Sequence, residues 1–142
     1  MTMDFKEFGV LPREAENIRR EVFVEEQGFR EEFDEADQRA AHLVLFISGQ
    51  AAATCRYLEK EEGGFLVGRI AVRKPFRKRG LGAELLKEAE RRIAAKGGKR
   101  LLVHAQTQAL GFYEKQGFSP FGEEDEEEGC PHVWMKKEIG TK

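Results

Sequence analysis

Residues 69–87 read Arg69-Ile-Ala-Val-Arg-Lys-Pro-Phe-Arg-Lys-Arg-Gly-Leu-Gly-Ala-Glu-Leu-Leu-Lys87. A short apolar run leads into a basic turn without an acid, and apolar residues then recur every four positions, as Leu81, Leu85, Ala89 and Ile93. A strand that passes through a glycine turn into a helix forms an anion site, because backbone N–H groups and the helix dipole point at the ligand. Six cations would add charge-assisted hydrogen bonds: Arg69, Arg73, Lys74, Arg77, Lys78 and Arg79.

The glycine spacing narrows the choice of anion. A P-loop requires a glycine, four residues and Gly-Lys-Ser/Thr, and this pattern does not occur. A dinucleotide fingerprint requires a third glycine three residues after Gly82, where this chain has Leu85. What remains is Arg77-x-x-Gly80-x-Gly82. A solvated loop or a nucleic-acid patch is the alternative, but the net charge of −2 favours one polyphosphate ligand over a long nucleic-acid backbone.

A second short motif, Phe112-Tyr113-x-x-x-Gly117-Phe118, ends a predicted helix at residues 109–116. The two motifs, in this order, resemble the acetyl-CoA signature and the companion motif of the GCN5-related N-acetyltransferases (GNAT). Further positions resemble the ElaA/YjcF branch of that superfamily. They are residues 24–28, Asp37, His42, Arg56 and the pair Pro131-His132.

The predicted elements fit a single α+β domain over residues 1–142. Strands are expected at 5–8, 42–47, 51–58, 65–72, 101–105, 118–122 and 132–138, and helices after Pro12, after Gly80 and at 109–116. Short turns join three of these strands into an antiparallel meander, and the strand–helix–strand unit 65–105 implies a parallel pair. The resemblance implies a GNAT-like mixed, mostly antiparallel sheet with helices on both faces and a splayed central parallel strand pair.

The resemblance also implies acetyl-CoA as the co-substrate. The main chain of the strand at 70–72 should receive the pantetheine arm, and the Val72 amide should polarise the thioester carbonyl. The pyrophosphate should lie on the amides of residues 78–83. The full set of expected cofactor contacts is Ile70, Ala71, Val72, Arg77, Lys78, Arg79, Gly80, Leu81, Gly82, Ala83, Phe112 and Lys115.

Acyl transfer to an amine needs a neutral amine, a stabilised carbonyl oxygen and a proton for the leaving thiolate. Tyr113 matches the tyrosine that the family often places near the cofactor sulfur, which implies a general acid; packing against Phe112 is the alternative. His132 follows Pro131 in a pair that resembles the catalytic base of glyphosate N-acetyltransferases, and a hairpin-capping histidine is the alternative. His104 is expected in the core rather than in the cleft, His42 is a weaker candidate, and ordered water could relay the proton instead.

The expected acceptor is the primary amine of a small molecule. A protein or peptide amine, or a non-catalytic acetyl-CoA-binding regulator, is the alternative. Candidate acceptor contacts are Glu26, Gln27, Arg56, His104 and Gln106. The acidic run 123–128 is expected at a solvated hairpin tip, where it could attract a cationic acceptor. The acidic segment 31–37 is expected as a loop in which Phe29 and Phe33 cover the sheet.

The composition limits the class of protein, the state of the cysteines and the expected partners. Hydrophobic residues make up 40% of the 142 residues, which is typical of a globular domain. No apolar run approaches the ~18 residues of a membrane helix, and the N-terminus lacks a signal-peptide core. Cys55 and Cys130 are expected as free thiols in a reducing cytoplasm. No Cys/His spacing suggests a metal site, so we expect no metal. We expect neither nucleic acid nor a membrane as a partner. The expected oligomeric state is a monomer or a homodimer.

Overall fold

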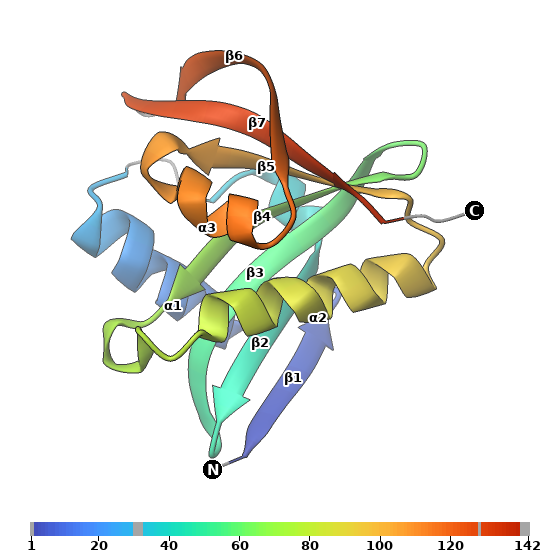
Figure 1. The fold of residues 1–142 in the computed structure, drawn as a ribbon. Helices are drawn as coiled ribbons and strands as arrows, with labels where there is room; N and C mark the ends of the chain where they lie inside the picture. Colours follow the sequence, from blue (N-terminus) through green and yellow to red (C-terminus); the bar gives the residue numbers. More distant parts are fainter. Residues whose placement is uncertain (1, 30–32, 128, 140–142) are drawn as a thin grey trace. The chain divides into compact units, whose positions relative to one another are not determined.

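The computed structural model describes residues 2–29, 33–127 and 129–139. Its strands are β1 (Met3–Phe8), β2 (Ala41–Ile47), β3 (Gln50–Glu61), β4 (Gly64–Val72), β5 (Arg100–Gln106), β6 (Ser119–Glu127) and β7 (Cys130–Glu138). They form a seven-stranded sheet in the order β1-β2-β3-β4-β5-β7-β6 (Figure 1). The β4–β5 pair is parallel, and the pairs β1–β2, β2–β3, β5–β7 and β7–β6 are antiparallel. The predicted mixed α+β sheet is therefore confirmed.

Backbone contacts divide the chain into two compact units, and each is described by itself. The first comprises Met1–Leu58 and Val67–Ala89, and the second comprises Glu59–Leu66 and Glu90–Lys142. None of the helices in the described residues is long and apolar enough to cross a membrane.

In the first unit, α1 (Arg13–Arg19) continues as a π-helical segment, Arg20–Glu26. The apolar face expected from the sequence is buried: Ile18, Val22 and Phe23 cluster with Ala71 of β4, and Phe29 packs against them. The sequence predicted one helix here but not the change of helical pitch. Such π-helical turns often mark functional sites.

Strand β4 contains an irregularity that the sequence did not reveal. Arg69 has φ +54°, in the left-handed region that residues other than glycine rarely adopt. Further along, η3 (Lys74–Phe76) follows β4, and α2 (Leu81–Ala95) begins after the basic turn. The left-handed residue falls inside the strand that was expected to receive the pantetheine arm.

The second unit contains the parallel ladder, which joins Gly64–Leu66 of β4 to residues 100–102 of β5. In the described chain this ladder covers three residue pairs, although both strands continue beyond it. After β5 come η4 (Thr107–Ala109) and α3 (Leu110–Lys115), as the second motif predicted.

Two expectations for the second unit were wrong. The acidic run does not form a hairpin tip, since residues 123–127 belong to β6, and residue 128 lies outside the described residues. Cys130 is not in a loop but begins β7. The reason is the pairing of β6 with β7, which is interrupted between Phe121 and Asp125 and then runs from Asp125 opposite His132 to Glu127 opposite Cys130. Both cysteines are free, as expected.

Candidate active site

The basic turn in the first unit has the backbone of an anion site. Lys78 and Gly80 both have positive φ, at 65° and 74°, which turns the chain sharply before α2. The first intrahelical hydrogen bond joins the Glu84 N–H to the Gly80 carbonyl at 3.1 Å. The amides of Leu81–Ala83 precede that bond and therefore have no acceptor within their own helix. The predicted strand, turn and helix N-terminus are all present.

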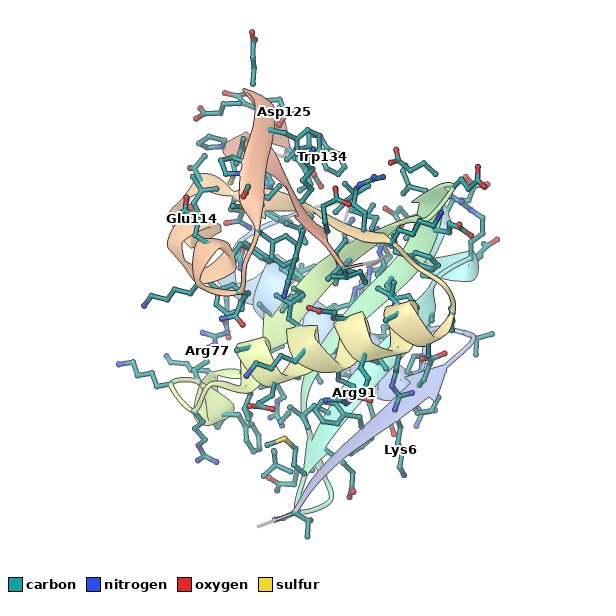
Figure 2. The ribbon with its side chains drawn as sticks, turned by 45° about the vertical axis from the view of Figure 1, so that its right-hand side comes forward. Lys6, Arg77, Arg91, Glu114, Asp125 and Trp134 are labelled. Carbon is teal, nitrogen blue, oxygen red and sulfur yellow. The ribbon has the colours of Figure 1, made fainter. Side chains whose placement is uncertain are left out.

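Arg77 ties this turn to two other segments of the first unit. Its Nε–H donates to the Val72 carbonyl at 2.8 Å, and its second guanidinium nitrogen donates to Glu26 at 2.6 Å. Figure 2 shows Arg77 at the turn that precedes α2. Glu26 ends the π-helical segment, and Gln27 follows it. Arg77 thus positions the end of β4, where the expected carbonyl polariser Val72 lies.

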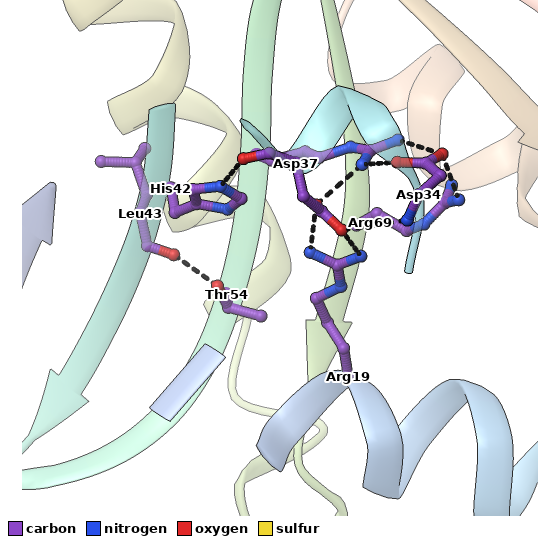
Figure 3. A network of polar contacts seen from close by, with 8 residues as sticks. Arg19, Asp34, Asp37, His42, Leu43, Thr54 and Arg69 are labelled. Carbon is purple, nitrogen blue, oxygen red and sulfur yellow. Dashed lines mark hydrogen bonds and ion pairs between the residues drawn. The ribbon is translucent and has the colours of Figure 1, made fainter. Parts of the chain in front are cut away.

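Arg56 belongs to an ion-pair network with Asp34, Asp37 and Arg19. Figure 3 shows Arg19, Asp34, Asp37 and Arg69 of this network. The guanidinium of Arg56 contacts Asp34 at 2.6 Å and Asp37 at 2.8 Å, while Arg19 donates to Asp37 at 2.7 Å. Arg19 and Arg56 are only 1% and 5% exposed. Arg69 adds a contact to Asp34 at 3.3 Å. The expectation that Arg56 contacts the acceptor is not tested by this geometry, but its charge is already balanced by two carboxylates.

The network shifts the acidities of its members. Burial alone would raise the pKa of Asp37, but hydrogen bonds and charges from Arg19 and Arg56 outweigh burial and lower that pKa to about 2. The hydrogen bond from Arg56 likewise lowers the pKa of Asp34. Burial lowers the pKa of His42, whose Nε2–H donates to the Asp37 carbonyl at 2.9 Å. His42 therefore supports the short 3₁₀ helix η2 (Glu35–Gln38), which carries Asp37 where a loop was expected.

A surface pocket of about 420 Å³ lies beside this network. Its walls combine apolar side chains with the carboxylates of the network and are formed by Val10, Leu11, Phe33, Asp34, Asp37 and Gln38. Phe33 also covers the guanidinium of Arg19, at 4.8 Å from the ring centroid. Phe33 thus covers the network, whereas Phe29 packs on the apolar cluster of the first unit. Residues 31 and 32 lie outside the described residues.

Tyr113 lies on α3 in the second unit and is partly buried. Its ring meets Phe112 edge-on at 5.0 Å and Phe118 at 5.6 Å between centroids. Lys115 is exposed at the end of the same helix. The aromatic packing orients the Tyr113 ring and is compatible with either a packing role or an acid role for its hydroxyl.

His104, which we expected in the core, lies instead in a polar cluster of the second unit. Its Nδ1 is 3.0 Å from Glu127 Oε1 and its Nε2 is 2.7 Å from Asp125 Oδ1. Its ring stacks on Trp134 at 4.6 Å and lies 4.7 Å from the His132 ring. His132 is 4% exposed, and its Nδ1–H donates to the Cys130 carbonyl at 2.8 Å. Figure 2 shows Asp125 on β6 and Trp134 on β7.

Strand pairing explains this cluster. Gln106 of β5 lies opposite His132 of β7, and His132 lies opposite Asp125 of β6. Directly paired residues point to the same face of a sheet. Asp125 and Glu127 were missed as individual site residues, because they stood in a run of acids that suggested only a solvated surface. The alternation of a strand through that run was the signal that could have found them.

The whole chain is similar to several known proteins. The sequence model of the acetyltransferase (GNAT) domain matches residues 4–139. The uncharacterized protein YyaT of Bacillus subtilis is 40% identical over 131 residues, covering 89% of this chain and 88% of that protein. The N-acetyltransferase YjcF of the same organism, also uncharacterized, is 34% identical, with 89% and 91% covered.

Solved structures show the same fold. Escherichia coli ElaA superposes with a TM-score of 0.84 at 23% identity, over 96% of this chain and 99% of that one. An acyl-CoA N-acyltransferase from Pseudomonas aeruginosa also has a TM-score of 0.84, at 26% identity, with 96% and 99% covered.

Proposed function

Because this chain belongs to the acetyltransferase (GNAT) domain family, we propose that it is an acetyl-CoA-dependent N-acetyltransferase. It transfers the acetyl group directly to the primary amine of a small molecule. The observation that carries the proposal is the turn before α2, where two left-handed residues precede amides without an intrahelical acceptor. Such a turn suits the pyrophosphate of coenzyme A, as helix N-termini suit phosphates in general.

The first unit contains the proposed binding site for the pyrophosphate and pantetheine arm of acetyl-CoA. The pyrophosphate lies on the amides of residues 78–83, with Lys78 and Arg79 adding charge. Arg77 acts through the main chain, since it holds the Val72 carbonyl at 2.8 Å. The main chain of Ile70 and Ala71 receives the pantetheine arm, and the Val72 amide donates to the thioester carbonyl oxygen. Phe112 and Lys115 lie in the second unit, and their proposed part in cofactor binding rests on the family motif alone.

The chemistry needs one acid and one base. The amine nitrogen attacks the thioester carbon, the carbon–nitrogen bond forms, and the carbon–sulfur bond breaks. Tyr113 donates its hydroxyl proton to the leaving thiolate, and His132 takes the proton of the amine. The tautomer of His132 supports this role, because its Nδ1–H donates to the Cys130 carbonyl and leaves the Nε2 lone pair available.

The proposed acceptor contacts are Glu26, Gln27, Arg56, His104 and Gln106. An amine acceptor arrives protonated at neutral pH, so carboxylates favour its approach. The side chains of Asp125 and Glu127 are 50% and 42% exposed, which leaves them within reach of such a cation. This charge favours a small cationic amine as the substrate.

Calorimetric titration with acetyl-CoA tests the donor, with NADH and ATP as controls. Saturable binding of acetyl-CoA alone supports the proposal. Thiol release in the presence of a panel of polyamines, aminoglycosides, amino acids and peptide amines then tests the acceptor. Release with peptides alone would replace the small-molecule acceptor with a protein amine. Failure to bind acetyl-CoA would overturn the proposed mechanism.

A further inference from the structure

We infer that His104, Glu127 and His132 form a binding site for one divalent transition-metal ion such as Zn²⁺. Each residue offers one ligand atom, and these atoms all lie within 4.8 Å of one another. The residues come from β5, β6 and β7, three strands that are hydrogen-bonded neighbours in the second unit. The site was not expected from the sequence, because its members are distant along the chain.

The spacing of the ligand atoms fits a metal. Two nitrogen or oxygen ligands of a Zn²⁺ ion lie roughly 3.0 to 3.5 Å apart, since each is about 2.1 Å from the metal. His104 Nδ1 and Glu127 Oε1 are already 3.0 Å apart. Because the side chain of Glu127 is 42% exposed, its carboxylate has room to adjust to a bound ion.

The hydrogen-bond partners of the two histidines also support a metal site. A metal-bound histidine usually donates its other ring N–H to a carboxylate or a backbone carbonyl, which fixes its tautomer. With Nδ1 of His104 as the ligand atom, its Nε2–H donates to Asp125 Oδ1 at 2.7 Å. His132 donates its Nδ1–H to the Cys130 carbonyl at 2.8 Å, which leaves Nε2 for the metal. Both histidines therefore have the orientation that two ligands need.

Two carboxylates face the ring of His104, and a bound metal ion or a second ring proton can balance their charge. A neutral imidazole has one N–H and one lone pair. Both ring nitrogens of His104 face carboxylate oxygens, so one lone pair would oppose Glu127 or Asp125 unless a cation intervenes. A metal between Nδ1 and Glu127 removes this repulsion, and Asp125 keeps its hydrogen bond. The competing solution is a second proton on His104, and the two solutions differ in their response to added metal.

The ligand types select the class of metal. Imidazole suits zinc, copper, iron and nickel, whereas magnesium and calcium prefer oxygen ligands. Two histidines and one carboxylate also form the ligand set of several zinc sites that keep a position open for water. We therefore expect Zn²⁺ and Co²⁺ to bind, and Mg²⁺ not to bind.

The test uses the full chain without a histidine tag, freed of metal by EDTA and dialysis. We expect Zn²⁺ to bind with one ion per chain by calorimetry, and Co²⁺ to give visible ligand-field absorption that Zn²⁺ displaces. His104→Gln and Glu127→Gln should each weaken Zn²⁺ binding by at least about tenfold, and Asp125→Asn by about 10- to 100-fold. Glu126→Gln is the matched control, because its side chain points to the other side of the same strand.

Each outcome decides the assignment. Absence of Co²⁺ absorption and of Zn²⁺ binding would leave the second proton on His104 as the explanation and overturn the site. Zn²⁺ binding that the His104 and Glu127 variants do not weaken would place the metal elsewhere and also overturn it. Circular dichroism on every variant shows whether it has folded, and acetyl-CoA titration shows whether the basic turn of the first unit is intact.

One consequence rests on the proposed function. A metal on Nε2 of His132 occupies the lone pair that the base needs. Zn²⁺ should therefore inhibit acetyl transfer, and EDTA should restore the rate, while acetyl-CoA affinity stays unchanged. Metal binding without inhibition would keep the site and remove His132 as the base. Loss of acetyl-CoA binding in the metal-free protein would count against the proposed function alone.

Discussion

At the scale of single residues, the Tyr113 hydroxyl is the part of the proposed mechanism that can be removed most cleanly. Its ring is held edge-on between Phe112 and Phe118. Tyr113→Phe keeps the aromatic ring and removes its hydroxyl. We expect kcat to fall by about 10²-fold or more, because the thiolate leaves without an acid, while the Kd for acetyl-CoA stays unchanged. Thiol-release kinetics and calorimetry measure the two quantities.

Tyr57 offers the matched control for this substitution. Its hydroxyl donates to Glu7 at 2.6 Å in the first unit, and we assign it no part in the reaction. Tyr57→Phe should cost about 1 kcal/mol of unfolding free energy without lowering kcat. If Tyr113→Phe keeps its full turnover, Tyr113 is a packing residue and the acid must be sought elsewhere.

The histidines show what residue types alone can and cannot reveal. His132 was recognised from its place after Pro131, and His104 from its alternation within a strand. Their proximity, with ring centroids 4.7 Å apart, depends on the register of β5 against β7. That register arises from long-range pairing, which a single sequence does not display. A catalytic candidate could thus be predicted, but not the cluster around it.

At the scale of elements, the ion pairs of Asp37 join α1 and β3 through the short helix η2 (Glu35–Gln38). The basic turn before α2 could be predicted, because its strand, glycines and helix are consecutive. The network could not, because Arg19 and Arg56 lie 18 and 19 positions from Asp37 and no local spacing relates them. Burying an unpaired charge is costly, so the buried guanidinium groups of Arg19 and Arg56 require carboxylate partners such as Asp37.

Asp37 makes the unfolding free energy depend on pH. Its folded pKa of about 2 lies below the unfolded value of 3.8, so the charged carboxylate contributes stability above pH ~4 that is lost as the pH falls through ~2. We expect this contribution to be on the order of 2 kcal/mol at neutral pH. Asp37→Asn should therefore unfold more easily than the wild type at pH 7, and the difference should shrink toward pH 2. Urea denaturation across this range measures it.

Asp4→Asn is the control for this pH series, because Asp4 is exposed on β1. It should follow the wild-type curve at every pH. A difference between wild type and Asp37→Asn that did not change with pH would show that the substitution acts through packing. The lowered pKa of Asp37 would then contribute nothing to folding.

At the scale of the whole molecule, the sequence predicted the mixed sheet and the order of its strands along the chain. The basic-turn motif and the Phe112-Tyr113 motif were enough to predict the fold, because the residues of each motif are close together in the sequence. The sequence did not predict the left-handed Arg69, the π-helical continuation of α1 or the length of β6. Each of these depends on packing or pairing with distant residues, which can override local preference. The departures lie in the segments that carry the proposed site residues.

The net charge of −2 opposes binding of a polyanion, so acetyl-CoA affinity must come from the local excess of cations in the basic turn. We expect that affinity to fall as salt rises, because the Debye length shortens from about 10 Å at 0.1 M to about 3 Å at 1 M. Arg79→Gln should weaken binding at low salt by about tenfold, which corresponds to one charge-assisted hydrogen bond. Calorimetry at several salt concentrations measures both effects.

Lys6→Gln separates local from global charge, because it changes the net charge by the same amount on β1, far along the chain from the turn. If the turn holds the phosphates, Lys6→Gln keeps the wild-type affinity while Arg79→Gln loses both affinity and salt dependence. Equal losses in the two variants would mean that acetyl-CoA responds to the field of the whole molecule. The basic turn would then be an ordinary solvated loop, and the expected donor site would have to lie elsewhere.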